Sequence, residues 1–398
     1  MKKYLKIIPI LLWIGISTRS AAQSTVNKEI YGYISDIQSV IGIDSLDGNW
    51  LLDNVIHSRI NTRWSKGTLD KNWKFGFDLR TRFIFGDQKK YSPDYKSKLK
   101  QNNLFMDLNW NIASGKSNVL NTSIERLYIS RTVRKVEVTL GRQRINWGTC
   151  FVWNPNDLFN NASFFDFDYE EKPGSDALRI QYYSDATTST ELVASLNHNG
   201  KLTLAGMFRE TISSYELQFI TGFFEGNNYY FGMGWSGALG KGSFYGEAAY
   251  LRKPTTDSLS TFMTSIGYAY TFSNKFDLRA EAFYTTLEKK DKSPQYVTSF
   301  LSSPVSLRQL SPAQYNLMLM GNYYITPLSR ISLTSIYYPD INSFYISPQI
   351  DISLIANFSL TINYQWLNQS YTRLKKNGKE RYDYMNTQIA HIRFKYNF

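Results

Sequence analysis

The chain has 398 residues, 16% of them aromatic, and carries a formal net charge of +12 at pH 7. Its single cysteine, Cys150, excludes an intrachain disulfide. No apolar run of about 18 residues follows residue 22, which excludes a membrane-spanning helix there. So many aromatic residues are rare in soluble proteins, whereas membrane β-barrels use them as girdles at both bilayer interfaces.

Residues 1–22 predict a secretory signal peptide. Three lysines precede an apolar core over residues 7–16, and small residues lead to a cleavage site after Ala22 or Gln23. Cleavage removes four of the 45 basic residues and none of the 33 acidic ones, which leaves a formal charge of +8. Because an exported protein does not meet nucleic acid, we expect an anionic solute or a lipid headgroup as the partner.

Residues 23–53 are ambiguous: residues 30–34 could form a short strand, but residues 44–49 are typical of a turn, and we interpret the segment as an N-terminal extension. From residue 54 to residue 398 the chain reads as amphipathic strands separated by turns, which predicts a transmembrane antiparallel β-barrel. In residues 73–85, aromatic and aliphatic side chains alternate with charged ones, so one face contacts an apolar medium and the other contacts water. Such runs are predicted at 55–65, 73–85, 104–112, 119–130, 135–145, 175–184, 190–197, 201–209, 214–224, 228–238, 243–251, 261–272, 276–287, 315–325, 331–338, 344–356, 358–368 and 383–398.

The last run alternates strictly and ends on Phe398. It resembles the closing strand of outer-membrane barrels, which commonly ends on an aromatic residue. In a soluble protein, an exposed apolar edge strand at the chain end would promote aggregation, whereas barrel closure pairs this edge. The runs predict 18 strands, with 16 as the alternative, and a soluble β-sandwich of this length would be oversized. Even strand number places both termini in the periplasm. The long, basic segment 86–103 then also falls on the periplasmic side, where short turns are expected.

Residues 141–179 form the most distinctive stretch of the chain. About thirty residues rich in aromatic, Asn and acidic residues connect two predicted strands, which is too long for an ordinary turn. We interpret this stretch as a loop that folds into the lumen and forms a constriction with the facing wall. The alternatives are an external loop with a solvated acidic face and, less favoured, a calcium site. The predicted constriction residues are Arg142, Arg144, Asp157, Asp166, Asp168, Glu170, Glu171 and Arg179.

The orientation of Arg142 and Arg144 is ambiguous. Their phase within the strand points them at lipid, whereas a bulge near Gly141 would turn them inward, which is favoured because a lipid-facing arginine is costly. Other charged residues take the inward phase of their strands. The predicted lumen wall contains Lys74, Asp78, Arg80, Arg82, Asp277, Arg279, Glu281, His391, Arg393 and Lys395.

Enzyme motifs are missing from the sequence. The three histidines, His57, His198 and His391, lie in no nucleophile or zinc motif, and neither a phosphate-binding loop nor a G-x-S-x-G elbow occurs. We therefore expect no catalytic residues, no metal and no cofactor.

The segments GRQRINWG (141–148), WNPNDLFN (153–160) and FDFDYEEKPGSDALR (165–179) resemble a family of porin-like outer-membrane proteins of diderm bacteria. The resemblance covers about forty residues. It implies a barrel of this size with a channel or transport role, and it implies no particular solute.

Two functions remain open at this point. One is a passive outer-membrane channel for small polar, possibly anionic, solutes, with lipid and the barrel-assembly machinery as partners. The other is a non-conducting barrel that acts as a surface-binding or assembly protein or as an integral enzyme. Transport of hydrophobic solutes is disfavoured by the inward charges.

Overall fold

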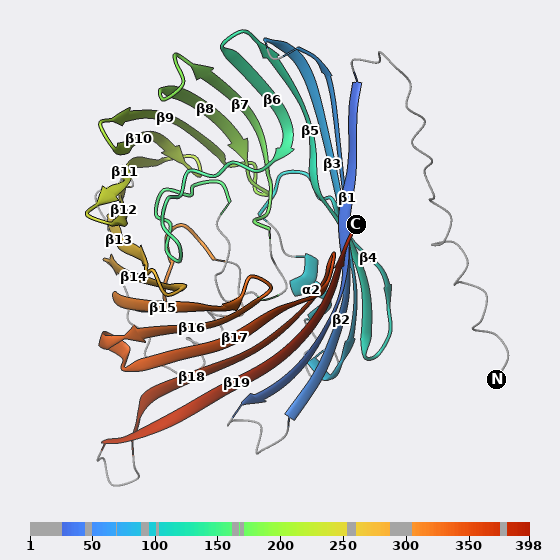
Figure 1. Cartoon of the computed structure of the whole chain (residues 1–398), viewed down its shortest axis with the longest axis vertical. Coiled ribbons are helices and arrows are strands. Elements are labelled where there is room, and N and C mark those ends of the chain that lie inside the picture. The colour runs from blue at the N-terminus through green and yellow to red at the C-terminus, as the bar shows by residue number, and fades with distance from the viewer. Residues whose placement is uncertain are drawn as a thin grey trace, which may run out of the picture.

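The computed structural model describes residues 26–43, 50–68, 70–88, 95–100, 103–160, 167, 171–252, 260–286, 305–374 and 380–398. It shows an all-β protein in which 18 antiparallel strands close into a barrel (Figure 1). Closure occurs between the first and last strands, where residues 33–43 pair with residues 387–397. Gly32 and Phe398 extend this pairing through two reciprocal backbone hydrogen bonds of 2.9 Å.

Consecutive wall strands pair with each other around the ring. The wall consists of β1 (Val26–Ile43), β2 (Trp50–Gly67), β3 (Lys71–Gly86), β5 (Asn118–Val133), β6 (Val136–Gln143), β7 (Ser175–Tyr183), β8 (Ser189–Leu196), β9 (Leu202–Ile212), β10 (Tyr215–Phe224), β11 (Asn228–Leu239), β12 (Gly242–Arg252), β13 (Thr261–Thr271), β14 (Phe276–Thr285), β15 (Tyr315–Thr326), β16 (Ser329–Tyr338), β17 (Ser343–Ile355), β18 (Phe358–Leu374) and β19 (Glu380–Asn397). A 3-10 turn, η3 (Pro339–Ile341), joins β16 to β17.

The strands bury one face and expose large apolar side chains on the other. In β13, Met263 and Ser265 are buried, whereas Phe262, Ile266 and Tyr268 are exposed. Alternation of this kind follows from the two-residue period of a strand. Because most wall strands expose such residues, the outer surface forms an apolar belt far larger than the patches of a soluble monomer.

The number of wall strands agrees with the predicted 18, but two of the predicted boundaries do not. Within the stretch interpreted as an N-terminal extension, β1 is a full wall strand that pairs with both β2 and β19. Its pattern is obscured because Asp36 and Gln38 lie on the outward face and bond to each other at 3.1 Å.

The run at 104–112 is not a wall strand. It contains β4 (Asn109–Ser114), which pairs only with β5, while β3 pairs directly with β5. A short helix, α2 (Tyr95–Lys100), lies against β4 and receives hydrogen bonds from Asn109 and Asn111. These two errors cancel in the strand count.

With β1 and β4 corrected, segment 86–103 joins the other long connections at one end of the barrel. Since neighbouring strands are antiparallel, successive connections alternate between the two ends. The connections 87–117, 144–174 and 286–314 therefore lie at the end opposite the termini. Segment 86–103, predicted to be periplasmic, belongs to this outer set and is no longer an exception.

Among the described residues, no helix has the length and apolar character needed to cross a bilayer.

Candidate functional site

The connection between β6 and β7 folds into the barrel, and two buried wall carboxylates hold its backbone there. Glu247 on β12 accepts hydrogen bonds from the backbone N–H groups of Thr149, Cys150 (3.0 Å) and Asn156 (2.7 Å). Glu281 on β14 accepts three more, from residues 151, 152 and 153, at 2.8 to 3.1 Å. A carboxylate that accepts several N–H groups satisfies backbone donors that would otherwise be buried without partners.

Side chains of the wall add further contacts to the same loop. Glu191 on β8 accepts the indole N–H of Trp147 at 2.9 Å, and Gln218 on β10 donates to the carbonyl of Trp147 at 2.7 Å. The hydroxyl of Tyr230 on β11 donates to the carbonyl of Pro155 at 2.9 Å. Hydrogen bonds to five wall strands, β8, β10, β11, β12 and β14, therefore fix the position of residues 147–156.

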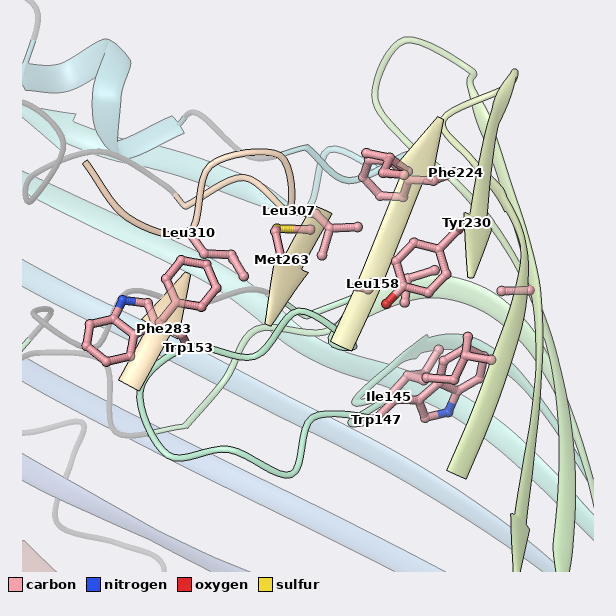
Figure 2. Packing of buried hydrophobic residues seen from close by; sticks show 14 of the residues in the cluster. Ile145, Trp147, Trp153, Leu158, Phe224, Tyr230, Met263, Phe283, Leu307 and Leu310 are labelled. Atoms are coloured by element: carbon pink, nitrogen blue, oxygen red, sulfur yellow. The ribbon is translucent and has the colours of Figure 1, made fainter. Parts of the chain in front are cut away.

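Apolar packing fills the space between this loop and the wall (Figure 2). The ring of Trp153 stacks on Phe283 at 5.6 Å, and Trp147 meets Phe159 edge to face at 5.0 Å. A second inserted segment, residues 305–313, contributes Leu307 and Leu310 to the same cluster. One side of the lumen, along β7 to β18, is thus packed like a protein core.

The other side of the lumen is polar and rich in cations. On β2, buried His57 and Arg59 alternate with exposed Ile56 and Ile60, which places the histidine and the arginine on the inner face. Basic side chains of this inner wall, formed by β19, β1, β2, β3 and β5, are Arg59, Arg63, Lys74, Arg80, Arg82, Arg126, Arg393 and Lys395. Its described acidic side chains are Glu29, Asp53, Asp78 and Glu125, and Glu137 on the neighbouring β6 pairs with Lys74.

Buried Asp78 on β3 organises the centre of this cationic wall. It bridges Arg59, at 3.0 Å, and Arg63. Next to them, the Nε of Arg80 donates to His57 at 3.1 Å. Asp78 alone balances only one of the two guanidinium groups that it contacts.

The far part of the loop crosses to the cationic wall. Glu171 forms an ion pair with Arg59 at 2.7 Å. The ring of Phe167 stacks on His391 at 4.6 Å, and Arg393 lies 4.8 Å from the centre of the same ring. The loop therefore spans the lumen from the packed side to the polar side.

The residues predicted for the constriction are distributed over several environments. Arg142 is buried at the end of β6, where it binds Asp176 on β7 at 2.8 Å and the carbonyl of Ile124 at 2.9 Å. Gly141 has a φ of 115°, so the backbone is irregular where the bulge was expected, yet Arg142 braces the wall and does not line the lumen. Arg144 is exposed.

The other predicted constriction residues that the structure describes bind partners in the loop or on the wall. Asp157 is buried and binds Lys172 at 2.8 Å, and Arg179 binds Glu191 at 2.8 Å. Of the predicted acidic residues, only Glu171 meets the cationic wall among the described residues. Asp166, Asp168 and Glu170 lie outside the described residues.

Residues predicted for the lumen wall take inward positions. Arg279 lies 4.2 Å from the ring centre of Phe151 in the loop, and Lys395 lies 4.4 Å from that of Tyr33. Lys74 binds Glu137 at 2.8 Å, and Arg82 binds Asn121 at 2.9 Å. Asp277 shares the strand phase of Arg279 and Glu281 on β14.

The sequence predicted Glu281 as a lumen-wall residue but missed four other residues that position the loop. Arg59, Arg126, Glu191 and Glu247 were not selected, although each lies within a predicted strand. For Glu247 a signal existed, since it shares the phase of Tyr245 and Ala249, but its inward position does not reveal that it binds the loop. A selection of every charged residue on the inward face of a predicted strand would have found all four.

Among the described residues, no group of three or more His, Cys, Asp or Glu side chains could hold an ion. Burial, together with Glu247 and Glu281 nearby, holds the pKa of the Cys150 thiol well above its usual value, which disfavours the reactive thiolate.

Comparisons with known proteins gave structural matches only. No family model matches the chain, and no curated protein matches it. A mutant of the Rh. blastica porin matches with a TM-score of 0.48 at 9% identity, over 94% of this chain and 100% of that chain. The in-vitro folded OmpT, an outer membrane protein of Vibrio cholerae, matches with a TM-score of 0.43 at 10% identity, over the same shares. The chain is thus similar in structure to bacterial porins at low sequence identity.

Proposed function

We propose that this protein is a porin-like outer-membrane channel for the passive diffusion of small polar solutes, with a preference for anions. The observation that carries the proposal is the division of the lumen into a packed side and a polar, cation-rich side. An 18-stranded barrel is wide enough for an aqueous channel even with loops folded inside. The conducting path would then run along β19, β1, β2, β3 and β5.

The preference for anions follows from the balance of charge along this path. Basic side chains outnumber acidic ones on the inner face of these strands, and the low-dielectric wall behind them weakens screening. A field of this sign raises the local concentration of anions and lowers that of cations.

The proposed location follows from the apolar belt and from the predicted signal peptide. We infer export through the periplasm, insertion with the help of the barrel-assembly machinery, and a boundary of outer-membrane lipid. Residues 1–22 lie outside the described residues, so the signal peptide remains a prediction from the sequence.

The test is the conductance of the refolded protein in a planar lipid bilayer under a salt gradient. Discrete steps with a reversal potential that favours chloride are expected. Steps that favour cations would overturn the anion preference. A folded, heat-modifiable barrel that never conducts would replace the channel proposal with a binding or enzymatic role.

A further inference from the structure

We propose that Arg59 is a carboxylate-binding subsite of the pore, which Glu171 occupies in this structure and which small organic carboxylates take during passage. The proposal rests on the channel function above and names the solute class that the channel selects. It makes Glu171 an internal competitor of the solute.

The two carboxylates bound to Arg59 differ in their accessibility. The Nε of Arg59 donates to Asn61 at 2.9 Å, and its Nη2 contacts Asp78 at 3.0 Å and Glu171 at 2.7 Å. The side chains of Arg59 and Asp78 are 2% and 0% exposed, whereas that of Glu171 is 40% exposed. Asp78 and Asn61 therefore fix the guanidinium from the wall, and Glu171 covers it from the lumen.

The wall keeps its positive charge when Glu171 leaves. Asp78 neutralises only one of Arg59 and Arg63, and Arg80 is the direct cross-strand partner of Arg59. The departing carboxylate thus exposes a preorganised guanidinium with a further cation beside it. This arrangement attracts a second carboxylate from solution.

Glu171 is tethered on a fixed backbone. The next residue, Lys172, binds Asp157 through its ammonium group at 2.8 Å and accepts a bond from Arg126 at its carbonyl, at 2.6 Å. Gly174 lies so close to the wall that an added Cβ would come within 2.7 Å of the Glu125 carbonyl. Rotation of the Glu171 side chain can therefore open the subsite while the loop stays in place.

The geometry of the subsite favours carboxylates over chloride. A guanidinium presents a planar fork of N–H donors that matches two oxygens of one carboxylate, and a spherical ion cannot use this match. Glu171, as a competitor tethered to the channel, acts at an effective concentration on the order of millimolar. Binding of an organic carboxylate should therefore saturate at concentrations in the same range.

The experiment measures single-channel current in a planar bilayer as sodium succinate replaces sodium chloride at constant ionic strength. We expect the current carried by succinate to saturate as the succinate concentration rises. The current carried by chloride should stay proportional to the chloride concentration. Glu171→Gln removes the competing charge and should lower the half-saturating succinate concentration about fivefold. Arg59→Lys keeps the charge, loses the fork, and should raise that concentration.

Glu216→Gln is the matched control. Glu216 pairs with Arg209 at 3.5 Å and is 39% exposed, so the change removes an equally exposed carboxylate from a distant strand. A linear succinate current, or equal effects of the two Glu→Gln variants, would overturn the subsite and leave the channel intact. Saturation with inorganic phosphate but not with succinate would overturn the carboxylate assignment. Absence of any conductance would instead overturn the proposed function itself.

Discussion

At the scale of single residues, Arg142 shows how an arginine in a barrel wall can serve structure. Its guanidinium binds Asp176 and two backbone carbonyls within a buried environment. Arg142→Leu leaves the buried carboxylate of Asp176 without its cation, which should cost about 3–5 kcal/mol of unfolding free energy. Urea unfolding in detergent micelles measures this loss. The exposed Arg144→Gln variant is the control, and a similar stability of both variants would contradict the role assigned to Arg142.

Arg393 represents the other class of arginine, on the lumen face of β19. We predict that Arg393→Gln shifts the reversal potential toward cations, because it removes a positive charge beside the conducting path. Arg131→Gln removes the same charge from the outer face of β5, where Arg131 lies 4.6 Å from the ring centre of Trp73. Equal shifts in both variants would show that the total charge of the protein, and not its lumen charge, sets the selectivity.

At the scale of elements, the loop 144–160 depends on two wall carboxylates. Glu247→Gln and Glu281→Gln each replace an acceptor of three backbone N–H groups with a group that also donates, so the loop should loosen. Cys150 reports this change, because its partial burial and raised pKa slow the reaction of the thiol in the native state. We expect maleimide labelling at neutral pH to accelerate by at least about tenfold in both variants. If Cys150 is labelled no faster in these two variants than in the Glu216→Gln control, apolar packing alone holds the loop.

At the scale of the whole molecule, closure depends on β1. Deletion of residues 26–43 leaves β2 and β19 with unpaired edges, and such edges expose backbone groups that a membrane cannot satisfy. We predict that this variant fails to form a barrel that resists detergent at room temperature. The measurement is the shift in electrophoretic mobility between heated and unheated samples, and a full shift in the deletion variant would contradict the closure seen here.

The sequence by itself determined the barrel class and most of the wall strands. A strand between lipid and water must alternate with a period of two, and this constraint acts on each segment separately, so runs such as 73–85 and 276–287 reveal it. The pattern fails for β1, because polar Asp36 and Gln38 lie on its outward face. It also wrongly predicts a wall strand at 104–112, where β4 pairs only with β5.

Only the tertiary structure decided which partner each charged side chain in the lumen contacts. Glu247 and Asn156 are 91 residues apart, and Glu281 and Phe151 are 130 apart, so nothing local joins these partners. The same holds for Glu171, which the motif singled out, and Arg59, which it did not. Alternation tells which side chains face the lumen, but closure of the ring and insertion of the loop set the distances between them.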